Sequence, residues 1–219
     1  MEPLDTVPLL GLYGAGAFGR ECLPLARHAA TRLLTAGAQI VFVEQETHAN
    51  HVANIPVWSH RRFLDHAGLR YFSIAIADSR VRARLAGDCI ESGAAPLSLV
   101  SDLALQYADA SIGTGIVQCP FSTISSEAKI GRFVHMNFGV YVAHDCVIGD
   151  FVTFAPAAQC LGRVHIGEHA FVGAGAVIHQ GTREQPHRIG ANAIIGMGAM
   201  VLEDVPDGIT VVGNPARPI

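Results

Sequence analysis

A repeat of six residues in the second half of the chain restricts its fold more than any other feature. Steps of six from Ile112 to Val201 meet an apolar side chain at fourteen of fifteen positions, if five extra residues before Ile189 are allowed for. Gln118 is the one polar exception. Neither the two-residue period of an ordinary strand nor the 3.6-residue period of a helix gives this pattern, whereas a solenoid with flat faces of six residues does.

A second position, four residues later in each hexapeptide, carries small or β-branched side chains from Ile116 to Val205, including Thr182 just before the register is interrupted. The stretch 111–219 also holds 15 of the 23 glycines, which suits a chain with many tight corners. Three hexapeptides close one triangular coil, so the repeat predicts a prism of about five coils. Large apolar side chains should fill the prism, and small ones should lie where the chain turns.

The first hundred residues lack this period and predict an α/β unit. An apolar run at residues 8–13 leads into a G-x-G-x-x-G segment at residues 14–19, a helical stretch, and a second apolar run at residues 39–43 that ends in Glu44. This is the order of a βαβ opening. Its glycine turn can hold the phosphate or sugar of a nucleotide-sugar, can be purely structural, or can belong to an NAD site, although few residues remain for a full dinucleotide fold.

A third strand is expected at residues 71–77, and the arginine-rich segment 78–93 is expected to form another helix. The domain boundary should lie near residues 97–111. We therefore expect an α/β domain over residues 1–100 and an all-β solenoid over residues 101–219.

Composition narrows the function classes. The 219 residues carry a formal net charge of −4 and are 50% hydrophobic, so the chain can bury a core and has no electrostatic match to nucleic acid or an anionic membrane. No apolar run reaches the roughly 18 residues of a membrane span, and the N-terminus carries acids instead of a basic leader, so we expect a cytoplasmic protein. Five cysteines without a C-x-x-C pair favour reduced core thiols.

Several hexapeptides, including IGRFVH, IGDFVT, IGEHAF and IGANAI, resemble those of the hexapeptide-repeat acyltransferases, whose fold is a left-handed parallel β-helix. With YGAGAFGRE, FVEQE and IAIADSRVR, nearly the whole chain resembles the sialic-acid O-acetyltransferase and bacillosamine N-acetyltransferase group. The resemblance implies a small Rossmann-like nucleotide-sugar-binding domain followed by a left-handed β-helix acyltransferase domain with a C-terminal tail. It also implies acetyl-CoA as co-substrate and a homotrimer with active sites between prisms.

His144 and Asp145 match the family's H-[DE]-x-x-I-G motif, which implies a general base and the acid that orients it. His144 stands third in its hexapeptide, where side chains should face outwards. Gly162 follows eighteen residues later, one coil further on, and its backbone N–H is the expected oxyanion donor. The alternative for the pair is a merely solvated histidine and aspartate.

Other solenoid residues match family positions less specifically. Asn137 could bind the amine of the acceptor or could be a polar rung of the solenoid. Thr153 stands where related enzymes can carry a histidine near the CoA sulfur, which puts a second histidine role in doubt. Ala174 and Met197 match positions that line the CoA channel together with Gly162, and plain packing is the alternative for both.

The acceptor should be held by the α/β domain, on residues expected to bind the nucleotide-sugar: Gly14, Gly16, Ala17, Phe18, Glu44, Asp78 and Arg82. The interruption over residues 179–188 should protrude, either as a lid near the acyl site or the CoA phosphates or as an ordinary solvated loop. His135, His165 and His169 invite a metal site, but their spacing does not align three ligands, so no metal is expected.

The leading hypothesis is thus an acetyl-CoA-dependent N-acetyltransferase acting on the amino group of a nucleotide-linked sugar, of the 4-amino-4,6-dideoxy type, for a surface glycan such as lipopolysaccharide. O-acetylation of sialic acid or another glycan sugar is the nearest alternative, because the same base would serve a hydroxyl. A longer acyl donor and a non-catalytic solenoid that binds nucleotide-sugars are further alternatives.

Overall fold

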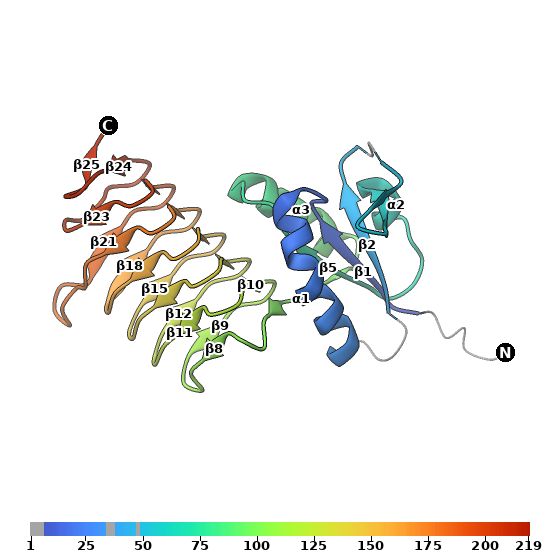
Figure 1. Ribbon diagram of the computed structural model, residues 1–219, viewed down its shortest axis with the longest axis horizontal. Coiled ribbons are helices and arrows are strands. Elements are labelled where there is room, and N and C mark those ends of the chain that lie inside the picture. Colours follow the sequence, from blue (N-terminus) through green and yellow to red (C-terminus); the bar gives the residue numbers. More distant parts are fainter. Residues whose placement is uncertain (1–6, 34–37, 47–48) are drawn as a thin grey trace. The chain divides into compact units, whose positions relative to one another are not determined.

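The computed structural model describes residues 7–33, 38–46 and 49–219. The chain divides into two compact units, Met1–Leu99 and Val100–Ile219 (Figure 1). No helix among the described residues has the length and apolar character needed to cross a bilayer.

The N-terminal unit is built on a six-stranded sheet in the order β3-β4-β2-β1-β5-β6. The central strand β1 runs parallel to β2 on one side and to β5 on the other, so the order reverses direction beside β1. The strands are β1 (Leu9–Tyr13), β2 (Gln39–Glu44), β3 (His51–Val52), β4 (Ile55–Ser59), β5 (Arg70–Ile74) and β6 (Ala95–Pro96), and the helices are α1 (Ala17–Leu33), α2 (His60–Leu64) and α3 (Ser79–Glu91).

Local sequence explains these elements. All five residues of β1 are buried, as expected for a central parallel strand covered on both faces. Asp78 caps α3 by accepting hydrogen bonds from the backbone N–H groups of Arg80 and Val81. The hairpin of β3 and β4 and the short helix α2 fall in a stretch without a periodic pattern of apolar residues.

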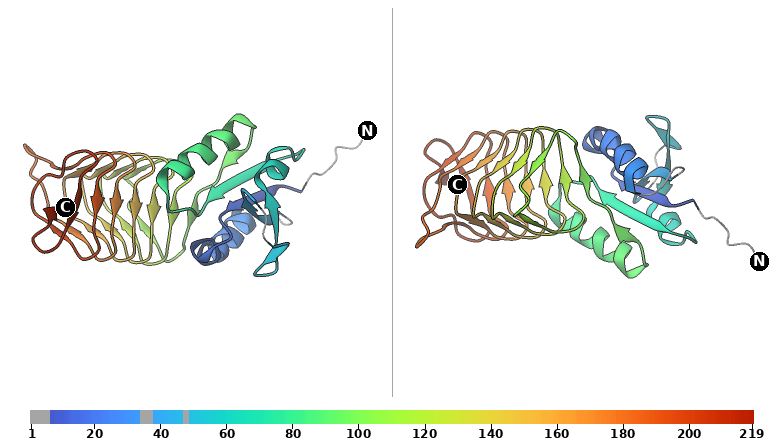
Figure 2. Two further views of the ribbon diagram at one scale, coloured as in Figure 1. Left: turned by 90° about the horizontal axis from the view of Figure 1, so that it is seen from above. Right: turned by 90° about the horizontal axis from the view of Figure 1, so that it is seen from below.

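The C-terminal unit is a parallel β-helix of three sheets (Figures 1 and 2). Sheet I contains β7 (Leu99–Val100), β10 (Val117–Gln118), β13 (His135–Met136), β16 (Thr153–Phe154), β19 (Phe171–Val172), β22 (Ile194–Ile195), β24 (Thr210–Val212) and β25 (Arg217–Pro218). Sheet II contains β8 (Leu105–Gln106), β11 (Thr123–Ile124), β14 (Tyr141–Val142), β17 (Gln159–Cys160), β20 (Val177–Ile178) and β23 (Met200–Val201). Sheet III contains β9 (Ser111–Ile112), β12 (Lys129–Ile130), β15 (Val147–Ile148), β18 (Val164–Ile166) and β21 (His187–Ile189).

The six-residue repeat maps directly onto this architecture. Met136 pairs with Phe154, and Phe154 pairs with Val172, so one coil takes eighteen residues. In most of the strands an apolar residue points inwards, and these residues form one continuous buried core together with the small residues of the corners. Even Gln118 is fully buried, and its side-chain oxygen accepts a hydrogen bond from Gln106 at 2.6 Å.

The interruption begins slightly earlier than the repeat predicts, at Thr182 and not after it. Ile166 pairs with Ile189, and Val164 pairs with His187, so His187 takes the buried corner place that the repeat gives to Thr182. Thr182 is exposed instead. Gly181 and His187 donate hydrogen bonds to the carbonyls of Gly162 and Arg163, two consecutive residues, so the five extra residues form an excursion over 182–186.

Candidate active site

His144 and Asp145 lie at the corner between β14 and β15, which we call the II–III edge because it joins sheets II and III. Asp145 has a left-handed backbone (φ 59°), and the His144 side chain is half-exposed. Nδ1 of His144 lies 2.7 Å from Oδ2 of Asp145. Because a carboxylate only accepts, Nδ1 carries the proton in this bond, and Nε2 is left as the basic atom of the neutral ring.

Gly162 lies against this imidazole, as its eighteen-residue spacing from His144 predicts. A Cβ built on Gly162 would come within 2.6 Å of Cε1 and 2.7 Å of Nε2 of His144. Any larger residue would displace the ring. The Gly162 N–H donates to no other group in the described part of the chain, so it is available to a ligand.

Arg163 completes the cluster and is the functional candidate that sequence reasoning missed. Its guanidinium lies 3.3 Å from Oδ2 of Asp145, the same oxygen that binds His144. The hydrogen bond from His144, with the positive charges of Arg163 and Arg183, lowers the pKa of the Asp145 carboxyl from its ordinary value. The sequence could have indicated this contact, since Arg163 follows Asp145 by eighteen residues, which is the length of one coil.

In the N-terminal unit, the glycine turn lies at the carboxyl end of β1. Gly14 has φ +97°, and a Cβ there would come within 2.9 Å of the carbonyl oxygen of Ala75, just after β5. The Glu44 carboxylate, at the end of β2, accepts a 2.5 Å hydrogen bond from the N–H of Ala15. The ends of β1, β2 and β5 therefore meet at this turn, where Gly16 and Ala17 are exposed and Phe18 is half-buried.

The two remaining predicted acceptor residues have structural contacts. Asp78 is exposed and uses Oδ1 to cap α3. Arg82 is fully buried, and its guanidinium donates to the carbonyls of Ile76 (2.7 Å) and Ala77 (3.1 Å). Burial lowers its pKa to about 10. In this structure Arg82 thus holds the loop between β5 and α3, and direct contact with the acceptor stays a prediction.

No protein-family profile matches the chain. The chain is 44% identical over 210 residues to the GDP-perosamine N-acetyltransferase of Escherichia coli O157:H7, which covers 95% of each sequence. It belongs to the hexapeptide-repeat sugar acetyltransferases. Its structure is similar to WeeI from Acinetobacter baumannii AYE (TM-score 0.93, 43% identity, 97% of this chain and 100% of that chain). It is also similar to PerB from Caulobacter crescentus, solved with CoA and GDP-perosamine (TM-score 0.83, 26% identity, 96% of each).

In this acetyltransferase, Gly162 is the one residue matched to the CoA channel that lies against His144, and the others lie away from it. Ala174 and Met197 follow β19 and β22 at the corner between sheets I and II, which we call the I–II edge, and both are exposed. Asn137 lies at the same edge, where its Oδ1 accepts a hydrogen bond from Phe138 N–H at 3.0 Å. Thr153 is buried in sheet I. Within one chain, sheet II separates this group from His144, Asp145 and Gly162.

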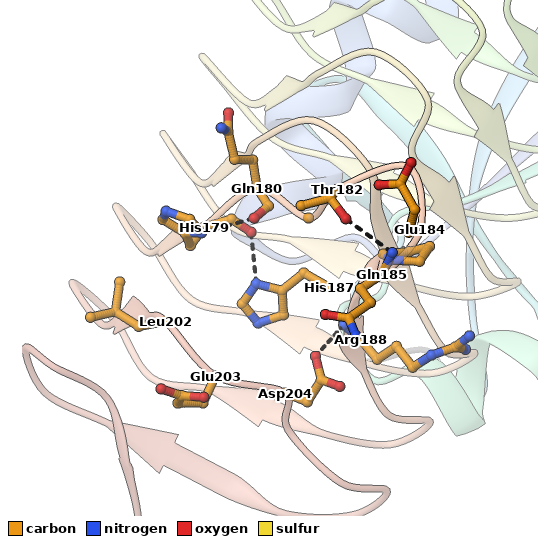
Figure 3. A pocket seen from close by; sticks show the side chains of 12 residues that line it. His179, Gln180, Thr182, Glu184, Gln185, His187, Arg188, Leu202, Glu203 and Asp204 are labelled. Atoms are coloured by element: carbon orange, nitrogen blue, oxygen red, sulfur yellow. Dashed lines mark hydrogen bonds between the residues drawn. The ribbon is translucent and has the colours of Figure 1, made fainter.

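The excursion over 182–186 divides two pockets of the acetyltransferase. One, of about 620 Å³, lies between the excursion and the following coil (Figure 3). There Nδ1 of the buried His187 lies 2.8 Å from the carbonyl oxygen of His179, and Arg188 N–H donates to Asp204. The other pocket, of about 470 Å³, begins at Asp145 and is lined by Arg163, His165 and Arg183.

The histidines considered for a metal site occupy different parts of the solenoid. His135 lies in sheet I and His165 in sheet III, while His169 lies at the corner that joins sheets III and I. Among the described residues, no group of three or more histidine, cysteine, aspartate or glutamate side chains is arranged to hold a metal ion.

Proposed function

We propose that this acetyltransferase moves the acetyl group of acetyl-CoA to the amino group of a nucleotide-linked sugar. The proposed acceptor is a GDP-linked 4-amino-4,6-dideoxy sugar such as GDP-perosamine, used for a surface glycan such as lipopolysaccharide. The observation that carries the proposal is the His144–Asp145 pair beside Gly162. The 44% identity to a GDP-perosamine N-acetyltransferase supports the choice of acceptor.

We assign each group a step in the reaction. The acceptor nitrogen attacks the thioester carbonyl, and Nε2 of His144 removes the proton that the nitrogen loses as the C–N bond forms. Asp145 keeps Nδ1 protonated and stabilises the imidazolium. The Gly162 N–H donates to the oxyanion of the tetrahedral intermediate. When the C–S bond breaks, the imidazolium returns the proton to the CoA thiolate.

The proposed place for the nucleotide is the N-terminal unit, as a Rossmann-like module. Support comes from the parallel order β4-β2-β1-β5-β6, whose reversal beside β1 is the usual position of a ligand crevice in open α/β sheets. The exposed Gly16 at the start of α1 leaves room for close approach to the backbone. A purely structural turn remains the competing interpretation, and the variants of Gly16 and Gly19 discussed below test it.

The proposed assembly is a cytoplasmic homotrimer of left-handed β-helices. Sheet II has outward residues without charge, namely Leu105, Thr123, Tyr141, Gln159, Val177 and Met200. This face is flanked by His144 at one edge and by Ala174 and Met197 at the other. A second copy packed against sheet II would bring the CoA-channel group of one chain to the His144 of its neighbour, and threefold repetition closes the ring.

The deciding experiment is the substitution His144→Asn, assayed with acetyl-CoA and GDP-perosamine. We expect kcat to fall by about 10² to 10⁴-fold with acetyl-CoA binding nearly unchanged. The matched control is His51→Asn, an exposed histidine of β3, which should keep wild-type kcat. More than half of the wild-type kcat in His144→Asn would overturn the general-base role.

The acceptor is tested separately by thermal shift with GDP-, UDP-, dTDP- and CMP-sugars. A ligand that binds the native state raises the apparent stability with the logarithm of its saturation. We expect the GDP-sugar to give the largest shift. A larger shift with another nucleotide would move the proposal to that nucleotide.

A further inference from the structure

The carboxylate behind the catalytic histidine is held from two coils at once. Oδ2 of Asp145 lies 2.7 Å from Nδ1 of His144 on its own coil and 3.3 Å from the guanidinium of Arg163 on the next coil. Asp145 and Arg163 occupy the same left-handed corner position, with φ values of 59° each. Backbone pairing keeps these coils in register, since Arg163 N–H donates to the carbonyl of His144.

From this geometry we infer that Arg163 is a positioning residue of the acetyl transfer, which orients Asp145 towards His144 and sets the pH range over which His144 acts as a base. The inference rests on the proposed function, because it assumes that His144 is the base. Arg163 itself does not reach the reacting atoms in this role. It acts through the carboxylate.

The orientation effect follows from the shared oxygen. A carboxylate next to a histidine can rotate away into solvent, and the Asp145 side chain is 43% exposed. A second donor on the same oxygen opposes that rotation. Loss of Arg163 should therefore reduce the fraction of molecules in which Nε2 is presented correctly, which lowers kcat at every pH.

The electrostatic effect has a definite sign. Protonation of His144 adds a positive charge, which Asp145 favours and Arg163 opposes. Without Arg163 the imidazole takes up a proton more easily, so the base is lost at a higher pH. The acidic limb of the kcat/KM profile should therefore move to higher pH when this positive charge is removed.

Other charged groups around the same corner also affect the protonation of His144. Arg183, in the excursion, lines the pocket that begins at Asp145, so it opposes protonation in the same direction at longer range. His165 lines that pocket too, and burial together with Arg188 and Lys129 lowers its pKa. Glu127 occupies the equivalent corner one coil earlier and has the opposite sign. Arg163 and Arg183 should therefore act on His144 in the same direction but with different strength, so variants of both are compared.

The test is the pH profile of kcat/KM and kcat for four variants of the full chain. In Arg163→Gln we expect the acidic limb to move up by about 0.3 to 1 pH unit, which is a loss of about two- to tenfold in kcat/KM below the limb. Arg163→Lys keeps the charge but not the planar fork, so the limb should stay while kcat on the plateau falls. Arg183→Gln should shift the limb in the same direction by less.

The matched control is Arg132→Gln. It also removes one arginine that pairs with an aspartate of the solenoid, Asp150 at 2.7 Å, but at another corner of the coil. We expect no shift of the limb. A merely structural role for Arg163 would lower kcat/KM by the same factor at all pH values, and an unshifted limb in Arg163→Gln would overturn the inference. The His144→Asn assay keeps the two proposals apart, since retained activity there contradicts the base itself.

Discussion

At the scale of single residues, the site depends on one missing side chain. The His144 ring lies so close to the Gly162 Cα that a Cβ would overlap Cε1 and Nε2. Gly162 is not in the positive-φ region, so alanine can adopt its backbone without strain. The glycine is therefore required by contact with the imidazole and not by the turn.

Gly162→Ala should lower kcat by about 10 to 10³-fold, because the new methyl group displaces Nε2 by about an ångström. The free energy of unfolding should change by less than about 1 kcal/mol, since the displaced atoms belong to a half-exposed side chain outside the core. Steady-state kinetics and urea unfolding of the same preparation measure both. Unchanged kcat would mean that the ring position seen here is not the catalytic one.

At the scale of elements, the turn between β1 and α1 separates two kinds of glycine. A Cβ on Gly16 meets nothing within 4 Å, whereas a Cβ on Gly19 would lie 1.7 Å from the carbonyl oxygen of Gly14. Gly19 therefore allows the helix to pack on the strand end. Gly16 leaves open space, which is what a ligand would use.

Gly16→Val should raise KM for the nucleotide-sugar by about tenfold or more and leave KM for acetyl-CoA unchanged, because the added bulk blocks approach to the backbone. Gly19→Ala should instead lower the free energy of unfolding by about 2 kcal/mol or more through the clash with Gly14. Kinetics with each substrate varied in turn, together with urea unfolding, separate the two. If KM for the nucleotide-sugar does not change in Gly16→Val, the turn is structural.

Element-level predictions from the sequence succeeded where the signal was periodic. The strands β1 and β2, the helix α3 and the three-sheet solenoid all follow from the apolar spacing of residues that are now seen buried. The prediction of a corner at Thr182 was wrong, because a residue count cannot tell whether the five extra residues begin at Thr182 or after it. Only the pairing of Val164 with His187 decides it.

At the scale of the whole molecule, His144 and Gly162 lie at one edge of sheet II, whereas Ala174 and Met197, which are matched to the CoA channel, lie at the other. One chain alone does not bring His144 and Met197 together. The uncharged outward face between them suits burial against a second prism. The site is therefore expected to depend on assembly.

The proposed trimer should have a mass of about 70 kDa in solution, three times the 23.2 kDa of one chain. Val177→Asp places a charge on the outward face of sheet II and should yield monomers with kcat reduced by about 10²-fold or more. Val147→Asp makes the same change on sheet III and should leave the mass unaltered. Light scattering after gel filtration measures the masses, and a fully active monomer would contradict the shared site.

The sequence by itself determined the solenoid, the α/β opening and the spacing that joins His144 to Gly162. The physical reason is that side-chain period and backbone hydrogen bonding are local and repeat with the coil. The tertiary structure alone decided which partners the polar side chains find. Arg82 is buried and donates to two backbone carbonyls, and Arg163 shares the oxygen that binds His144, because side-chain packing and coil register set these contacts.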